Sequence, residues 1–163
     1  MAEENNPTND PIILVDGSSY LYRAYHALPP LLTSANQPTG AIKGVISMVK
    51  RILIDHPNSP VAVVFDAKGK NFRHDMYEAY KANRPPMPTD LVEQIEPIHK
   101  IIKLMGIKLI SVSGVEADDV IGTLANEAMI KELDTVISTG DKDMTQLVCK
   151  NVKVVNTMSG ELL

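Results

Sequence analysis

Hydrophobic residues along the chain alternate between short continuous runs and longer stretches with helical spacing. The short runs, typical of buried parallel strands, are residues 12–15, 61–65, 108–112, 135–138 and 152–156. The longer stretches, in which apolar residues recur at i, i+3, i+4 and i+7, are residues 18–27, 39–55, 89–105 and 117–131. This alternation predicts an α/β fold with a mostly parallel five-stranded sheet flanked by helices.

Polar residues, proline and glycine predict where the helices begin and end. The side-chain oxygens of Ser, Thr and Asp can accept hydrogen bonds from the first amides of a helix. The candidate caps are Ser18 or Ser19, Thr39, and Thr89 or Asp90. Pro97 predicts a kink and Gly106 a helix end. In the fourth helix the expected inward positions are Val120, Ile121, Leu124, Ala128 and Met129.

Two segments depart from this alternation. Residues 1–11 are polar and contain two prolines, which predicts a disordered leader before a core over residues 12–163. Residues 67–90 are rich in Lys and Arg and end in a proline-rich run. We expect them to form a partly helical excursion from the core.

Carboxylates recur at the predicted ends of four successive strands. They are Asp16, Asp66, Glu116, Asp118, Asp119, Asp141 and Asp143. The carboxyl ends of parallel strands share one edge of the sheet, where α/β proteins bind ligands. We therefore expect these side chains to converge in one crevice.

Converging carboxylates need a counter-charge. Two like charges about 4 Å apart repel by roughly 4 kcal/mol at an effective dielectric constant near 20. Oxygen ligands without His or Cys suit Mg²⁺ or Mn²⁺, and two such ions can activate a water and stabilise the leaving oxygen of a phosphodiester. Taken singly, each acid also has a simpler explanation as a helix cap or turn residue. Their recurrence after four strands favours a metal site.

The basic excursion holds five of the 16 Lys and Arg residues, namely Lys68, Lys70, Arg73, Lys81 and Arg84. Aromatic residues lie among them, and this combination binds backbone phosphates and stacks on bases. A solvated surface is the simpler alternative. We expect the excursion to lie over the acidic crevice and to grip single-stranded or frayed DNA.

Bulk composition bounds the possibilities. A net charge of −4 is unusual for a simple nucleic-acid binder. The single cysteine, Cys149, cannot form an internal disulfide and is expected to fill a small apolar space. A single cysteine is compatible with a protein of the reducing cytoplasm. No apolar run approaches the roughly 20 residues that span a bilayer. We expect structural roles for the histidines, which are His26, His56, His74 and His99.

Five motifs carry a family resemblance. They are residues 13–24, 63–66, 80–88, 114–122 and 138–143. In this order they resemble the 5′-nuclease domain of bacterial DNA polymerase I, whose family includes flap endonucleases and is similar to PIN-domain nucleases. The resemblance implies a PIN-like core that hydrolyses DNA at 5′ ends or flaps with two divalent ions, in primer removal and DNA repair.

The resemblance also implies residue roles. The first metal would be held by Asp16, Asp66, Glu116 and Asp118, with Asp119 as a further candidate, and the second by Asp141 and Asp143. The basic residues Lys81 and Arg84 would contact the scissile phosphate from a helical arch. Further DNA contacts would come from Arg73, Tyr77 and Tyr80, and from Tyr22 or Arg23 on the first helix.

The family pattern continues beyond this sequence, which ends at Leu163. Family members carry a further acidic segment that completes the second metal site, then a helix–hairpin–helix element and, in DNA polymerase I, a polymerase module. We therefore expect a fragment with weak or no activity of its own, monomeric and from the bacterial cytoplasm, associated with the nucleoid. Two alternatives stay open: a non-catalytic DNA-structure-binding module and a magnesium-binding phosphoacceptor domain.

Overall fold

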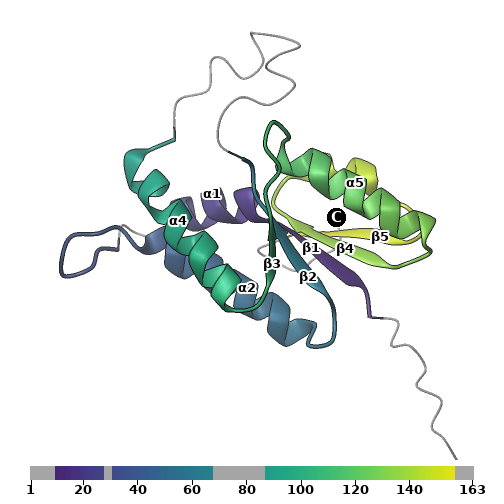
Figure 1. Cartoon of the computed structure of the whole chain (residues 1–163), viewed down its shortest axis with the longest axis horizontal. Coiled ribbons are helices and arrows are strands. Elements are labelled where there is room, and N and C mark those ends of the chain that lie inside the picture. Colours follow the sequence, from purple (N-terminus) through teal and green to yellow (C-terminus); the bar gives the residue numbers. More distant parts are fainter. Residues whose placement is uncertain (1–9, 28–30, 68–86, 157–163) are drawn as a thin grey trace, which may run out of the picture.

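The computed structural model of the chain describes residues 10–27, 31–67 and 87–156 (Figure 1). Its centre is a parallel five-stranded sheet in the order β3-β2-β1-β4-β5. The strands are β1 (Ile12–Asp16), β2 (Val61–Val64), β3 (Lys108–Ile110), β4 (Thr135–Thr139) and β5 (Val152–Asn156). The chain builds outward from β1 to β3 and then crosses to β4 on the other side of β1. The sheet order therefore reverses between β1 and β4, which is where open α/β sheets bind ligands.

Helices cover both faces of the sheet. On one face lie α1 (Gly17–Ala27), α2 (Gly40–Asp55) and α4 (Thr89–Leu104), and on the other lies α5 (Ala117–Ile130) (Figure 1). A short 3-10 helix, η1 (Lys142–Leu147), connects β4 to β5. The sequence pattern did not predict η1, because its six residues are too few to show a helical period.

Successive side chains of the central strand β1 pack into two hydrophobic cores, one on each face of the sheet. Ile13 and Val15 are fully buried with α1, α2 and α4, whereas Leu14 is buried with α5. Side chains alternate across a strand, so both faces of β1 need apolar residues. This explains the continuous apolar run of the sequence, and it places Asp16 on the same face as Leu14, toward α5.

The predicted elements are confirmed with small shifts of their ends. The third strand ends at Ile110, two residues early. The predicted helix end at Gly106 is confirmed by a left-handed backbone with φ of 79°. Thr39 precedes α2 without a side-chain cap, and its hydroxyl donates instead to the Leu31 carbonyl oxygen at 3.3 Å. Thr89 lies inside α4, whose first turn contains Asp90, and no side chain caps that helix.

Two burial predictions are wrong. Met129 is 40% exposed, and Cys149 is exposed as well. The buried stripe of α5 runs through Ala117, Ile121, Ala125 and Ala128, so the next residue has turned by about 100° toward solvent. The Cys149 thiol lies 3.5 Å from the Met129 sulfur at this surface.

Several predictions fall on residues outside the described ranges. These are most of the leader, residues 68–86 of the excursion, His74, and the proposed DNA contacts Arg73, Tyr77, Tyr80, Lys81 and Arg84. No helix in the described ranges is long and apolar enough to cross a membrane.

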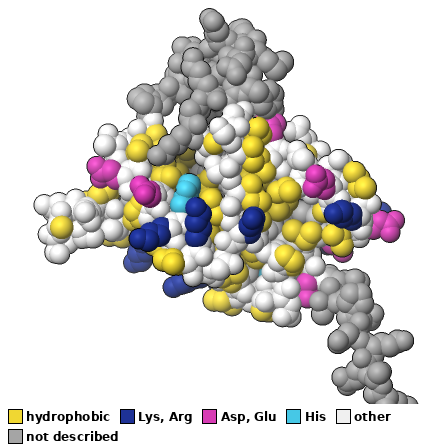
Figure 2. Space-filling view, in the orientation of Figure 1, with side chains coloured by type: hydrophobic (Ala, Val, Ile, Leu, Met, Phe, Trp, Pro, Cys, Tyr) yellow, Lys and Arg dark blue, Asp and Glu magenta, His cyan; other side chains and the backbone are white. Residues whose placement is uncertain are grey.

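Charged side chains are unevenly distributed over the visible surface. In the orientation of Figure 2, most of the Lys and Arg side chains in view lie over α2 and α4, whereas several of the acidic side chains lie on the α5 side. The net charge of −4 therefore does not describe each surface of the molecule.

Candidate active site

Six of the seven predicted carboxylates line one cleft of about 720 Å³ at the carboxyl ends of the strands. They are Asp16, Asp66, Glu116, Asp118, Asp141 and Asp143. We call this the acidic cleft. The predicted convergence is thus present in the described part of the chain. Asp119 does not line the cleft, because one helical step from Asp118 turns its side chain by about 100°.

Asp16 is the most deeply buried of these carboxylates. It ends β1, is 3% exposed, and accepts a hydrogen bond on each oxygen. The Ser19 amide donates to Oδ1 at 3.2 Å, and the Thr139 hydroxyl donates to Oδ2 at 2.7 Å. Burial raises the pKa of Asp16, while these two bonds oppose the rise by stabilising the charged form.

Hydroxyl groups on the first turn of α1 hold the neighbouring strand ends. The Asp66 amide donates to Ser18 Oγ at 3.0 Å, and the Gly140 amide donates to Ser19 Oγ at 2.7 Å. The prediction that Ser18 or Ser19 caps the helix is therefore wrong. Asp16 accepts from the helix amide instead, which leaves the serine hydroxyls to bind two adjacent segments.

Gly140 lies in close contact with α1. A Cβ at this position would be 2.8 Å from Ser19 Oγ and 3.3 Å from Arg23 Nη2. The absence of a side chain lets the segment that follows β4 approach the helix. This close approach brings the residue after it, Asp141, to the acidic cleft.

Asp118 carries the strongest electrostatic perturbation in the cleft. Burial is the main cause that raises its pKa to about 7, and the charges of the nearby acids add to it in the order Asp16, Asp141, Asp66 and Glu116. The start of α5, which carries Asp118, is fixed by a bond of 2.7 Å from the Ala117 amide to Asp66 Oδ1. Four strand ends thus contribute charge to a single group.

Asp141 caps the short helix η1, and Asp141 and Asp143 both line the acidic cleft. Asp141 Oδ1 accepts from the Asp143 amide at 2.9 Å, which caps η1. The Asp141 amide itself donates to Thr139 Oγ1 at 3.0 Å. The simpler explanation as a helix cap is therefore correct for Asp141, and both carboxylates nevertheless line the cleft.

The donor set suits a hard divalent ion, although it is not arranged around one. Six carboxylates supply oxygen ligands only, as Mg²⁺ and Mn²⁺ prefer. Within residues 10–27, 31–67 and 87–156, no group of three His, Cys, Asp or Glu side chains is positioned to hold a metal ion. Like charges without a cation repel each other, so ligation requires side-chain adjustment.

Helix α1 contributes non-acidic residues to the cleft. Tyr22, which is 42% exposed, and Arg23 both line it, so both of the predicted alternatives lie at the site. His26, for which a structural role was expected, also lines it. By contrast, the His99 ring packs at 4.4 Å from the Phe65 ring. The spacing of four residues from Tyr22 to His26 could have placed both on one helix face.

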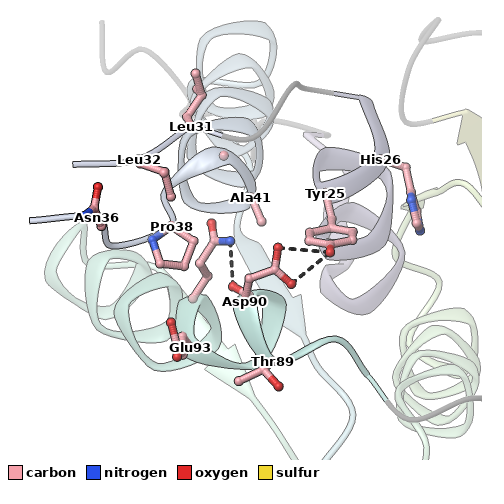
Figure 3. Close-up of a pocket in the computed structure, with 12 residues that line it drawn as sticks. Tyr25, His26, Leu31, Leu32, Asn36, Pro38, Ala41, Thr89, Asp90 and Glu93 are labelled. Carbon is pink, nitrogen blue, oxygen red and sulfur yellow. Dashed lines mark hydrogen bonds between the residues drawn. The ribbon is translucent and has the colours of Figure 1, made fainter. Parts of the chain in front are cut away.

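A second cavity of about 520 Å³ adjoins the cleft through His26 (Figure 3). It lies between the last turn of α1 and the first turns of α2 and α4. The Tyr25 hydroxyl donates to both Asp90 oxygens, at 2.9 and 3.1 Å. Gln94, 2% exposed, accepts from the Ile42 amide and donates to the Asp90 carbonyl oxygen. These bonds join the three helices beside the site.

Sequence comparison identifies the family. Residues 11–162 match the family described as 5′-3′ exonuclease, N-terminal resolvase-like domain. The chain belongs to this family. DNA polymerase I from Pseudomonas aeruginosa is 58% identical over 153 residues, which are 94% of this chain and 17% of that protein. A 5′-3′ exonuclease from Buchnera aphidicola subsp. Baizongia pistaciae is 49% identical over 143 residues, 88% of this chain and 47% of the relative. The chain thus spans less than half of each.

Solved structures share the fold at low identity. The T5 D15 protein, co-crystallised with metal ions, superposes with a TM-score of 0.70 at 20% identity, covering 93% of this chain and 56% of that one. The catalytic core of Rad2 in complex with DNA gives a TM-score of 0.58 at 18% identity, covering 93% and 45%. These similarities confirm the predicted parallel, PIN-like α/β fold.

Proposed function

We propose that this chain is the catalytic core of a metal-dependent 5′ nuclease, which hydrolyses DNA phosphodiesters at 5′ ends or 5′ flaps. The observation that carries the proposal is the acidic cleft, where six carboxylates meet at the switch point of the sheet. Binding alone does not require so much converging negative charge. Membership of the 5′-3′ exonuclease family supports the same activity.

The carboxylates would bind two divalent ions, Mg²⁺ or Mn²⁺. Asp16, Asp66, Glu116 and Asp118 would hold the first, and Asp141 with Asp143 would contribute to the second. When bound, such ions supply a nucleophile at neutral pH and stabilise the leaving oxygen. The Asp118 carboxyl, with its pKa near 7, would release its proton as a cation enters.

The protein itself would position the DNA. A cleft of six carboxylates repels a phosphate backbone, so positive side chains must accompany the ions. Arg23 lines the cleft and is suited to contact a phosphate. Within the excursion, Lys81 and Arg84 would contact the scissile phosphate, and Arg73, Tyr77 and Tyr80 would bind the displaced strand. Asp119, outside the cleft, would act only through the start of α5.

The substrates would be DNA with 5′ ends, flaps or RNA primers, met in replication and repair in the bacterial cytoplasm. Further acidic ligands would come from the part of the relatives that this chain does not span. A polymerase module would follow in a protein of the DNA polymerase I type. The chain alone would be monomeric and weakly active.

The test is cleavage of a labelled 5′-flap DNA by this chain and by a version extended through the missing acidic segment. We expect cleavage by the extended version with Mg²⁺ or Mn²⁺, and its loss in Asp118→Asn. The Tyr25→Phe variant of the extended version, altered outside the cleft, is the matched control. Flap binding without cleavage, in both versions and with both metals, would instead support the non-catalytic DNA-binding alternative.

A further inference from the structure

One fully buried hydroxyl contacts two acidic residues of the cleft at once. Thr139, the last residue of β4, is 0% exposed. Its Oγ1 donates to Asp16 Oδ2 at 2.7 Å and accepts from the Asp141 amide at 3.0 Å. It therefore bridges β1 and the segment after β4 across the point where the sheet order reverses.

The strand register creates this contact. Val15 of β1 lies beside Ser138 of β4, so the residues that follow, Asp16 and Thr139, lie next to each other at the edge of the sheet. Both point toward the α5 face, because each is two residues beyond a side chain of that core, Leu14 or Ile137.

The direction of each hydrogen bond is determined by chemistry. An amide N–H can only donate, so Thr139 Oγ1 must accept from Asp141. The single hydroxyl proton is then left for Asp16, and an ionised carboxylate can only accept it. With the Ser19 amide on the other oxygen at 3.2 Å, the Asp16 carboxylate is held at both ends.

We propose that Thr139 is a positioning residue, which orients the Asp16 carboxylate and the Asp141 backbone relative to each other for divalent-metal binding. This inference rests on the proposed function. Hydrogen-bonding partners behind a metal ligand change metal affinity by about 10–100-fold when removed. Thr139 is such a partner for Asp16, and it holds the segment of Asp141 with the same oxygen.

The chain offers a matched control in the adjacent residue. Ser138 is 1% exposed, lies on the same strand, and points to the opposite face, where its hydroxyl is 2.6 Å from the Tyr20 hydroxyl. Removing the Ser138 hydroxyl takes away its hydrogen bond to Tyr20, whereas removing the Thr139 hydroxyl takes away two, and only Thr139 contacts the acidic cleft. A loss of stability alone would affect both variants.

The experiment measures binding of Mn²⁺ alone to the chain, from the electron paramagnetic resonance signal of the free ion. Thr139→Val keeps the shape and removes the hydroxyl, and we expect its Mn²⁺ Kd to rise about tenfold or more. Thr139→Ser keeps the hydroxyl and should restore most of the affinity, and Ser138→Ala should bind as the unaltered chain does. Thermal unfolding verifies that each variant is folded, and Thr139→Ala replaces the valine variant if the latter does not fold.

Each outcome decides a different point. Unaltered Mn²⁺ affinity in Thr139→Val, or an equal loss in Ser138→Ala, overturns the role of Thr139 and leaves the proposed function intact. If Thr139→Val binds Mn²⁺ more weakly but the extended version cleaves no flap DNA, the positioning role of Thr139 is supported and the proposed nuclease activity is contradicted. Absence of Mn²⁺ binding by the unaltered chain overturns both.

Discussion

The carboxylates on the two sides of the acidic cleft differ in burial and in hydrogen bonding. On the β1–β4 side, Asp16 is nearly inaccessible to solvent and has a hydrogen bond on each oxygen. On the β2–α5 side, Asp118 is less buried, and no hydrogen bond from the described residues reaches its carboxylate. Four neighbouring acids add to the burial that raises the Asp118 pKa to about 7. Depth of burial therefore does not by itself determine which carboxylate has the more strongly raised pKa.

The difference assigns separate tasks to the two sides. Hydrogen bonds to a charged group stabilise it more than bonds between neutral groups do, so the β1–β4 side keeps a carboxylate in a fixed orientation. The β2–α5 side holds repelling charge that a cation would relieve. Substitutions on the two sides should consequently have opposite effects on the metal-free protein.

The largest expected effect is stabilisation by the metal itself. A ligand at about 100 times its Kd stabilises the folded state by about 2.7 kcal/mol, which corresponds to a Tm increase of roughly 5–10 °C for a chain of this size. We expect Mn²⁺ at pH 8 to produce such an increase, measured by circular dichroism, and Asp118→Asn to lose most of it. A metal-free sample treated with EDTA is the control, and an equal increase in the variant would contradict a role for Asp118 in binding.

The next effect is a loss of stability on the hydrogen-bonded side. Asp16→Asn replaces two acceptor oxygens by one oxygen and one amide, so either the Ser19 amide or the Thr139 hydroxyl loses its acceptor. A buried donor without an acceptor costs about 1–3 kcal/mol, which urea denaturation without metal should detect. An unchanged or increased stability would mean that removing the charge of the buried carboxylate outweighs the loss of one hydrogen bond.

In contrast to Asp16→Asn, the variant Asp118→Asn should be more stable than the unaltered chain in the absence of metal. The size of this stabilisation should depend on pH. Between the ordinary pKa of 3.8 and the folded-state pKa of about 7, the folded chain keeps a proton that the unfolded chain releases. Stability from this group is therefore present at low pH and lost as the pH rises through about 7. The Tm of the variant should exceed that of the unaltered chain by an amount that grows from pH 5 to pH 8. Solvent screening at a half-exposed group limits the gain to a few degrees, and a pH-independent difference would contradict the assignment.

Backbone and side chains differ in how far sequence reasoning predicts them. The strands and the shared edge of the acids follow from apolar periodicity and the geometry of parallel sheets, so Asp16, Asp66 and Asp141 were found together. Which hydroxyl binds which strand end depends on register and side-chain rotation, and these arise only from tertiary packing. For this reason the cap assignment of Ser18 and Ser19 was wrong and the bridging role of Thr139 was not anticipated, although a Thr-Gly pair directly before a cleft Asp was a usable signal.

A smaller effect separates the two serines that attach α1 to the strand ends. Ser19→Ala removes the acceptor of the half-buried Gly140 amide, and Ser18→Ala removes that of the more exposed Asp66 amide. A single hydrogen bond contributes about 0.5–1.5 kcal/mol, with the more buried amide expected at the upper end. Urea denaturation of both variants gives the comparison, and a larger loss for Ser18→Ala would mean that solvent replaces the bond at Gly140 more easily than at Asp66.

The smallest effect is expected where neither side of the cleft is touched. Tyr25→Phe removes the hydroxyl that donates to Asp90 in a solvent-exposed hydrogen bond beside the second cavity (Figure 3). Solvent competes for such a bond, so the Tm should fall by no more than about a degree or two, with Mn²⁺ affinity unchanged. The Asp90 bond also raises the pKa of Tyr25, so the small stabilisation is present below pH 10 and is lost as the phenol ionises at higher pH. If this variant binds Mn²⁺ more weakly, the contact between α1 and α4 affects metal binding in the cleft. The metal site would then depend on residues outside the two sides compared above.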